Sequence, residues 1–171
     1  MKMLVCYFSS TGNTKKVAEA VFQGLEEENH DSTLVPIKDA DPATLKDYDL
    51  VILGSGIYGG KFHKDVMGFM KKAGETLAPK FALFCTHNSP KVSEKGLKRL
   101  IGTIEKAGSE LVGMWDCAAP NLGMSAEAIA MMMKNMPDDQ RAQAEAYNEK
   151  IKNKPDAQDL ENAKGFGQSL L

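Results

Sequence analysis

Short apolar runs alternate with helix-like segments along most of this chain, and this alternation constrains the fold more than any other feature of the sequence. The apolar, β-rich runs cover residues 3–8, 32–37, 49–56, 80–86 and 110–118. Segments with helical spacing of apolar residues cover 15–28, 63–74, 93–108 and 155–170. Strands that are apolar throughout and are joined by helices form a parallel sheet covered on both faces. The sequence therefore predicts a doubly wound α/β fold with a five-stranded parallel sheet.

One segment interrupts the alternation. Residues 119–154 separate the fifth strand from the closing helix, where a few residues normally suffice. This segment resembles two helices, at 125–136 and 138–154, that are separated by Pro137. A chain of 171 residues has the size of one ordinary domain. We therefore expect a single domain, 1–171, with a helical insertion at about 119–154 before its last helix.

Four of the ten methionines lie in the insertion between Met131 and Met136. Methionine is flexible and polarizable, so a dense group of methionines either forms an adaptable binding surface or fills gaps in a core. We interpret these four as core filler beneath a surface helix.

Charge and cysteine content exclude several classes of protein. A formal net charge of −2 provides no global basic field for nucleic acid or anionic lipid. No apolar run approaches the roughly 20 residues that span a bilayer, and no cleavage site follows the first strand, so we expect a cytoplasmic protein. Cys6, Cys85 and Cys117 lie in or beside apolar runs without metal-ligand spacing. We interpret them as reduced thiols in buried strands.

The first strand leads into the loop SSTGNT, residues 9–14, and then into a helix. Hydroxyl groups, a permissive glycine and the free N–H groups of a helix N-terminus together favour a phosphate. The alternative is a capping turn, but one cap needs one hydroxyl. The fingerprints of nucleoside triphosphate and dinucleotide sites are missing from the sequence, which leaves a mononucleotide. The candidate phosphate ligands are Ser9, Ser10, Thr11, Gly12, Asn13 and Thr14.

These residues carry a family resemblance. SSTGNT looks like the phosphate loop of flavodoxins, and GSGIYGGKFHKDV, residues 54–66, resembles the isoalloxazine loop of the wider flavodoxin-like family. The resemblance covers about 1–118 and 155–171, whereas 119–154 do not match. It implies FMN as the cofactor and the strand order 2-1-3-4-5. The implied contacts of the second loop are Ser55, Gly56, Ile57, Tyr58, Gly59 and Gly60.

Two further loops are expected at the same crevice, beyond the carboxyl ends of the strands. The glycines of 54–60 allow a flat backbone to lie against a planar ligand, and Tyr58 either stacks on that ligand or packs on its own loop. His87 is either a ligand contact or a solvated loop residue, and His63 is a helix-start residue rather than a catalytic acid. No catalytic residue is assigned. The groups that could bind the pyrimidine edge of a flavin are Thr86, His87, Asn88 and Ser89.

The expected rim of the flavin site is basic, whereas flavodoxins of low potential are, as a family, acidic around the flavin. Residues 54–72 hold four lysines against one aspartate, and residues 86–99 hold four cationic residues against one glutamate, which gives each segment a charge of +3. We expect these charges to act on the cofactor, although solvent can screen such groups. The lysines we assign to the rim are Lys61, Lys64, Lys91 and Lys95.

Three functions remain open at this point. An electron carrier would cycle FMN between redox states for a partner protein that docks over the ring edge. A flavoenzyme would bring a quinone or porphyrinogen directly to the ring, and an apo scaffold would bind only a phosphate. We favour the carrier, because the sequence shows no dedicated acid or base and the insertion carries no obvious substrate signature.

Overall fold

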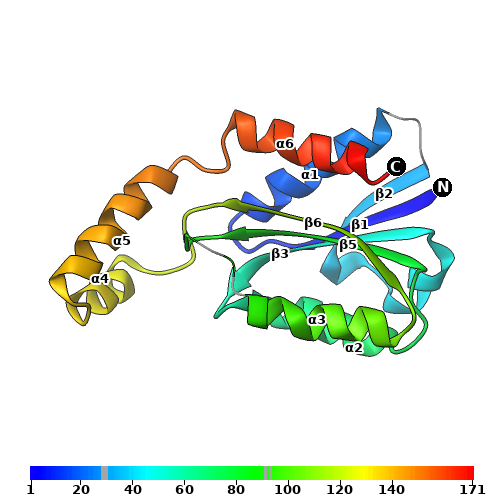
Figure 1. Ribbon diagram of the computed structural model, residues 1–171, viewed down its shortest axis with the longest axis horizontal. Coiled ribbons are helices and arrows are strands. Elements are labelled where there is room, and N and C mark those ends of the chain that lie inside the picture. The colour runs from blue at the N-terminus through cyan, green and yellow to red at the C-terminus, as the bar shows by residue number, and fades with distance from the viewer. Residues whose placement is uncertain (28–30, 91, 93) are drawn as a thin grey trace.

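Five parallel strands form the central sheet of the protein. The structure is a computed structural model that describes residues 1–27, 31–90, 92 and 94–171 (Figure 1). The order of the strands is β2-β1-β3-β5-β6, so the predicted fold and strand order are confirmed. The parallel strands are β1 (Lys2–Phe8), β2 (Asp31–Pro36), β3 (Leu50–Tyr58), β5 (Lys80–His87) and β6 (Glu110–Ala118).

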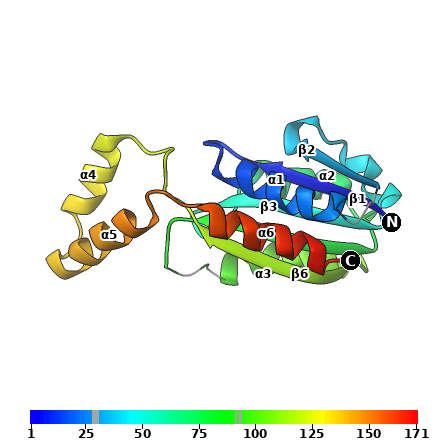
Figure 2. The ribbon, with the colours of Figure 1, turned by 90° about the horizontal axis from the view of Figure 1, so that it is seen from above.

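Two pairs of helices cover the two faces of the sheet. Helices α1 (Asn13–Glu26) and α6 (Ala157–Ser169) lie on one face, and α2 (Lys64–Ala73) and α3 (Glu94–Lys106) lie on the other (Figures 1 and 2). Helices α1 and α6 approach closely at Gly167, where an added Cβ would meet the Val21 carbonyl oxygen at 2.3 Å. Ser93, the first residue of the helical segment predicted at 93–108, lies outside the described residues.

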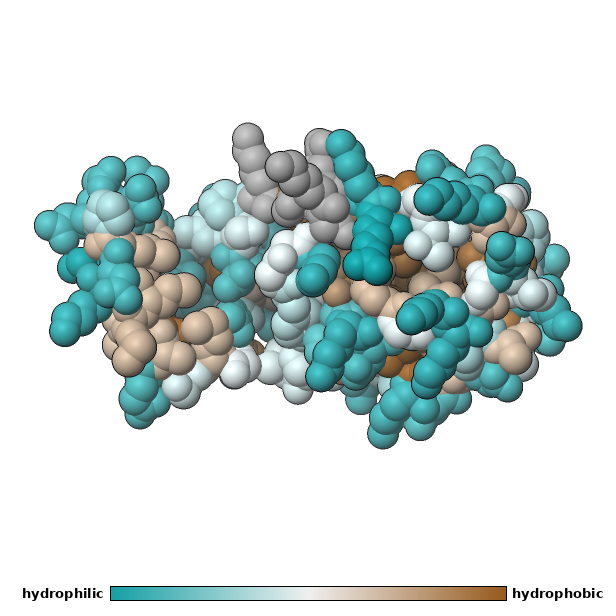
Figure 3. Space-filling view, turned by 90° about the horizontal axis from the view of Figure 1, so that it is seen from below, coloured by the Kyte–Doolittle hydropathy of each residue, from teal (hydrophilic) through white to brown (hydrophobic). Residues whose placement is uncertain are grey.

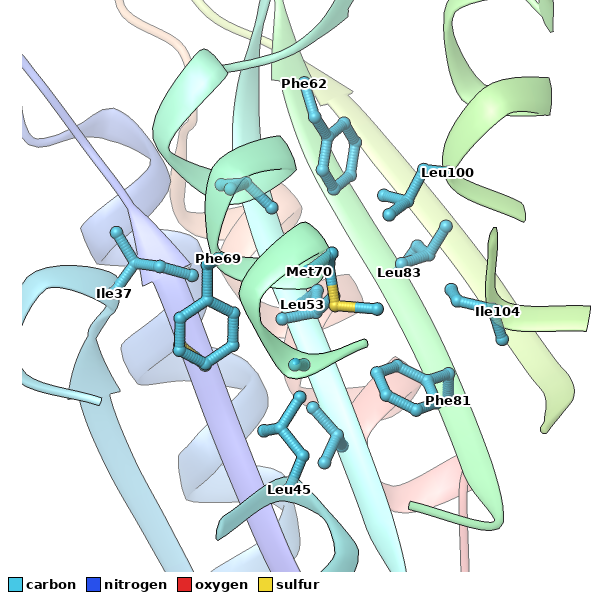
Figure 4. Packing of buried hydrophobic residues seen from close by; sticks show 14 of the residues in the cluster. Ile37, Leu45, Leu53, Phe62, Phe69, Met70, Phe81, Leu83, Leu100 and Ile104 are labelled. Atoms are coloured by element: carbon cyan, nitrogen blue, oxygen red, sulfur yellow. The ribbon is translucent and has the colours of Figure 1, made fainter. Parts of the chain in front are cut away.

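Each face of the sheet has its own hydrophobic core, because successive side chains of a strand point to opposite faces. In β1, Cys6 packs toward α2 and α3, whereas Val5 packs toward α1 and α6. Figure 4 shows the core beneath α2 and α3, where aromatic rings and aliphatic chains interdigitate. Both faces of the central strands are therefore buried, which explains why these strands are apolar throughout. The labelled members in Figure 4 include Leu53, Phe62, Phe69, Met70, Phe81, Leu83 and Leu100.

The sheet also has a short sixth strand that the sequence pattern does not predict. Strand β4 (Lys61–Phe62) pairs antiparallel with the end of β3. Gly59 and Gly60 make the tight turn between them with positive φ values of 57° and 80°, which glycine adopts without strain. Gly59 and Gly60 therefore serve a hairpin turn at the end of β3.

The connection from β2 to β3 contains only short helical turns, in agreement with the limited room that the sequence indicates. These turns are η1 (Ile37–Asp39) and η2 (Pro42–Asp47). Asp41 accepts a hydrogen bond from the Ala43 N–H and so caps η2.

The insertion forms two helices, α4 (Ala126–Lys134) and α5 (Asp138–Ile151), that project from the sheet as an arm (Figures 1 and 2). Pro137 stands at the N-cap of α5, so the predicted break is confirmed. No residue of α4, which the structure describes completely, is buried, and Met131 is 69% exposed. The interpretation of these methionines as core filler is therefore wrong, because the arm extends beyond both cores.

The three thiols are free and buried, as predicted. Burial raises the pKa of the Cys6 and Cys117 thiols to about 12 and raises the pKa of Cys85 as well. Thiols with such pKa values are poor nucleophiles and metal ligands. Within the described residues, His, Cys, Asp and Glu form no group that could hold a metal ion, and no helix is long and apolar enough to cross a bilayer.

Candidate functional site

A cavity of about 530 Å³ lies at the carboxyl ends of the strands, where the chain order reverses between β1 and β3. Ligands of doubly wound sheets bind at this position. All three loops singled out in the sequence contribute to the walls of the cavity. Their lining residues are Ser10, Thr11, Asn13, Thr14, Gly56, Ile57, Tyr58, Gly59, Thr86, His87 and Asn88.

The first loop presents the N-terminus of α1 to this cavity. Gly12, with a φ of 96°, occupies the N-cap and has no side chain with which to cap the helix. The first N–H groups of a helix have no partner inside it, and they favour an anion. The Ser9 hydroxyl instead accepts a hydrogen bond from the Gly12 N–H at 3.1 Å, and the Ser10 hydroxyl contacts the Tyr58 hydroxyl at 2.8 Å. Neither hydroxyl serves as the helix cap, so the loop fits a phosphate better than a simple capping turn.

Two buried residues of the first loop hold the site together. The Thr14 hydroxyl lies 2.9 Å from the Thr86 hydroxyl and so joins the first loop to the third. The Asn13 amide donates a hydrogen bond of 3.3 Å to the Pro120 carbonyl, where the insertion begins. Ser10 and Thr11 remain exposed at the mouth of the cavity. The exposed hydroxyls are available to a ligand, whereas the buried pair fixes the geometry.

The second loop is organised around Tyr58, which is 39% exposed. Its ring packs edge-on against Phe8 and His63, with centroid distances of 6.0 and 4.9 Å. His63 stacks on Phe8 at 3.7 Å and accepts a hydrogen bond from the Asp65 N–H, so it is the helix-start residue that the sequence predicts. Tyr58 therefore both packs on its own loop and lines the cavity.

Ser55 and Gly54 have structural roles below this loop. The buried Ser55 hydroxyl donates to the Gly56 carbonyl at 2.7 Å and accepts from the His63 N–H at 3.0 Å. A Cβ at Gly54 would lie 1.9 Å from the ring of Phe84, so only glycine fits beneath that ring. Neither residue lines the cavity.

His87 in the third loop is 8% exposed, so the alternative of a solvated loop residue is wrong. Its Nδ1 lies 2.7 Å from the Ser89 carbonyl oxygen, and its Nε2 lies 2.8 Å from Oδ2 of Asp116 in β6. Carbonyl and carboxylate oxygens only accept hydrogen bonds, so each ring nitrogen of His87 faces an acceptor. The Tyr147 hydroxyl of α5 also donates to the Ser89 carbonyl, at 2.8 Å. This network joins the third loop to β6 and to the arm.

The cavity differs from the sequence prediction in two ways. Five candidate residues lie outside its lining, namely Ser9, Gly12, Ser55, Gly60 and Ser89. The start of the insertion, residues 119–124, forms a wall that the sequence analysis did not assign. The position of 119–124 in the sequence could have predicted this wall. These residues follow the fifth parallel strand, and the carboxyl ends of parallel strands meet at one edge of the sheet. Asp116 and Tyr147 carried no such signal.

A separate basic groove of about 840 Å³ adjoins the cavity at Tyr58. Lys61 and Lys64 line this groove rather than the cavity itself, together with Lys71 and Arg99. The predicted contributions of Lys91 and Lys95 lie outside the described side chains. The described basic residues therefore lie beside the cavity at its Tyr58 end.

The family of the chain follows from comparison with known proteins. The model of the flavodoxin domain family matches residues 4–164. The chain belongs to the flavodoxin family. Flavodoxins are flavin-binding redox proteins, so the cavity at the switch point of this chain is a candidate flavin site.

Two relatives match the chain along its whole length. An uncharacterized protein of Methanocaldococcus jannaschii is 28% identical over 172 residues, which cover 100% of this chain and 99% of that protein. The flavodoxin-like domain-containing protein BilS of Clostridioides difficile is 28% identical over 186 residues, with 100% and 97% covered.

Solved structures show the same fold. Oxidised flavodoxin 1 from Bacillus cereus has a TM-score of 0.69 at 18% identity and covers 99% of this chain and 97% of its own. A flavodoxin from the domain Archaea has a TM-score of 0.67 at 20% identity, with 99% and 96% covered.

Proposed function

We propose that this protein binds FMN in the cavity and carries electrons to or from a partner protein. The observation that carries the proposal is the N-terminus of α1, which Gly12 leaves without a side-chain cap beside the exposed hydroxyls of Ser10 and Thr11. This donor set suits the terminal phosphate of a mononucleotide. The sequence lacks the glycine fingerprint that would hold an adenine dinucleotide after the first strand.

The other two loops suit the isoalloxazine ring. Thr86, His87 and Asn88 would face its polar edge, and Tyr58 would lie along it. The flavin, when bound, supplies the electron chemistry, while the protein orients it and sets its electrostatic surroundings. The wider set of proposed cofactor residues remains Ser9 to Thr14, Ser55 to Gly60 and Thr86 to Ser89.

A carrier fits this site better than an enzyme that uses general acid–base catalysis. Among the described residues that line the cavity, the titratable side chains are Tyr58 and His87. Both nitrogens of His87 are bonded within the protein, and the Tyr58 hydroxyl contacts Ser10. Neither group is held ready to transfer a proton to a substrate.

The basic groove indicates the kind of partner. Lys61, Lys64, Lys71 and Arg99 surround a hollow that begins at the half-exposed Tyr58. Opposite charges steer encounter between proteins and orient them on docking. We therefore propose a redox partner with an acidic surface that docks on this groove and reaches the flavin at the Tyr58 end.

We also propose that 1–171 is a single flavodoxin-like domain in which 119–154 is an insertion. Residues 119–124 line the same cavity as the loops of the sheet, and Asn13 bonds to Pro120. Separation of the insertion would therefore open the cavity.

The test of FMN binding is direct. The purified protein should be yellow, and acid should release a flavin that co-migrates with FMN on chromatography. Recovery of FAD, or of no flavin after incubation with FMN, would reject the proposal. Carrier function is tested next, by comparing reduction of an acidic redox protein with reduction of a quinone. Faster turnover of the quinone would favour the enzyme instead.

A further inference from the structure

A second cavity, of about 550 Å³, lies beside the candidate flavin cavity and is built largely by the arm. Its walls come from residues 88–90, residues 120–124 and the helices α4 and α5. The volume falls in the range of small-molecule sites. The two cavities share wall residues, namely Asn88, Pro120, Asn121, Leu122 and Met124. A molecule in the second cavity would therefore lie next to a molecule in the first.

The lining of the second cavity indicates the chemistry of its ligand. Met132, Met133 and Met136 give it a polarizable apolar wall, and methionine sulfur makes favourable contacts with aromatic rings. Gln140 and Gln143 add amide groups that can donate hydrogen bonds. No aspartate or glutamate occurs among the described residues of this lining. The lining suits an aromatic molecule better than a cation.

One cationic group stands at this lining. Lys152 is exposed there, and its ammonium also contacts the carboxylate of Glu149. Exposed pairs of this kind contribute little to stability and exchange partners readily. Lys152 can therefore pair with an acidic group on the ligand.

The walls of this cavity are held in place by hydrogen bonds. The Tyr147 hydroxyl donates to the Ser89 carbonyl at 2.8 Å and so fixes α5 to the third loop. Burial and the nearby Asp116 carboxylate raise the pKa of Tyr147, so its hydroxyl keeps the proton that it donates. The Arg141 guanidinium donates to the carbonyls of Met133 and Met136, at 2.9 and 3.1 Å, and so holds the turn between the two helices. The cavity is therefore a defined part of the fold.

We propose that this second cavity binds a small aromatic molecule that carries hydrogen-bond acceptors or a single negative charge. The shape of the cavity favours a small molecule over a protein partner. Residues 88–90, residues 120–124 and the arm surround it from separate parts of the chain, so it is a hollow rather than a flat face. A protein partner or a second copy of the chain would instead use the outer side of α4, where the strongly exposed Met131 lies outside the lining. Figure 3 shows apolar residues gathered on one face of the arm, at the left of the view. The inference goes beyond the proposed carrier function and does not require bound flavin.

Two dyes that differ by one charge test this proposal. The probes are 1-anilinonaphthalene-8-sulfonate and its uncharged analogue N-phenyl-1-naphthylamine, titrated into protein labelled with ¹³C-methyl methionine. Each should bind at one site per chain and shift the methyl signals of Met132, Met133 and Met136, while the signal of Met131 stays in place. The experiment is run with and without FMN, so a failure to bind flavin is recorded separately.

Matched variants of α4 separate the cavity from the outer face. Met133→Glu should weaken binding of both dyes at least about tenfold, because it puts a charge into an apolar site. Met131→Glu, on the same helix but outside the lining, should leave both affinities within about twofold of the parent. Lys152→Gln should weaken the sulfonate dye by about threefold or more and leave the neutral dye unchanged. Circular dichroism checks that each variant keeps its helices. If Met133→Glu does not, Met133→Leu in protein labelled with ¹³C-methyl methionine takes its place.

Several outcomes would overturn the proposal. Equal losses in Met131→Glu and Met133→Glu, or shifts spread over all exposed methionines, would show an open apolar surface suited to a protein partner. Self-association in sedimentation equilibrium that Met131→Glu abolishes would assign the face to a second copy of the chain. Absence of saturable binding for both dyes would reject a small-molecule site.

Discussion

Apolar side chains occur both in the sheet with its four covering helices and in the arm, yet the two regions use them in opposite ways. In the sheet, aromatic and aliphatic side chains such as Phe81 and Leu53 are fully buried between layers. In the arm, α4 has no buried residue, and Ile151 is the one buried residue of α5, both helices being described throughout. An amphipathic helix buries its apolar face only where another layer covers it. The arm has no such layer, so its apolar side chains remain available to a ligand.

The two regions are also held by different forces. Burial of apolar surface dominates in the sheet, whereas the arm relies on caps and a few hydrogen bonds. Ser125 caps α4 by accepting from the Ala128 N–H, and Arg141 closes the turn to α5. Tyr147 fixes the arm to the third loop. The difference implies that substitutions in the two regions should have unequal effects.

The largest contrast is expected in stability. Phe81→Ala should lower the free energy of unfolding by about 3–5 kcal/mol, because it leaves a cavity in the core of Figure 4. Met131→Ala in the arm should change it by less than ~0.5 kcal/mol. Urea unfolding followed by circular dichroism measures both. Comparable losses in the two variants would mean that the arm is packed as tightly as the sheet.

The next effect concerns the phosphate loop. Thr11→Ala should weaken FMN binding by about 1.5–3 kcal/mol, the usual contribution of a hydrogen bond to a charged group. Because Thr11 is exposed, stability without FMN should stay unchanged. Thr44→Ala, in η2 and outside the lining of the cavity, is the control. Fluorescence titration of FMN gives the affinities, and equal values for Thr11→Ala and the parent would show that this hydroxyl does not reach the phosphate.

A smaller effect is expected where the arm meets the sheet. Tyr147→Phe removes the hydrogen bond to the Ser89 carbonyl and should cost about 0.5–1.5 kcal/mol. The loss should appear as faster amide exchange in α5 and in the third loop, while exchange in β1 and β3 stays unchanged. Uniform acceleration across the sheet would show instead that the arm and the sheet unfold as one unit.

The smallest effect concerns the basic groove. Changing Lys61 and Lys64 together to Gln should lower the midpoint potential of bound FMN by more than about 10 mV, or ~0.2 kcal/mol per electron, because cations stabilise the reduced, more negative flavin. It should also weaken the salt dependence of association with an acidic partner. Lys46→Gln, in η2, is the control. A smaller shift than this would show that solvent screens the two lysines.

Much of the fold follows from the sequence because burial on both faces imposes a local pattern. The apolar runs identify β1, β3 and β5, and the break at Pro137 separates α4 from α5. Strand β4 escaped prediction because two residues are too short to show a period. Its turn is set by Gly59 and Gly60, whose positive φ is a property of the hairpin.

The site could be predicted in part for a related reason. The loops that follow β1, β3 and β5 carry their chemistry in contiguous residues, and most of those residues line the cavity. The wall at 119–124 was missed because its residues lack the hydroxyls and charges that mark a binding loop. Asp116, a partner of His87, was missed because it lies 29 residues away in the sequence and meets His87 only in the fold.

By itself, the sequence determined the doubly wound sheet, its strand order through the family resemblance, and the loop at the start of α1. These features depend on local periodicity and on contiguous motifs. Only the tertiary structure decided that none of the four methionines between Met131 and Met136 is buried, that His87 is buried, and that the arm and the third loop line a second cavity. Those properties depend on which surfaces meet. A helix with the same apolar stripe is buried under a covering layer and exposed without one, and no local pattern records whether that layer is present.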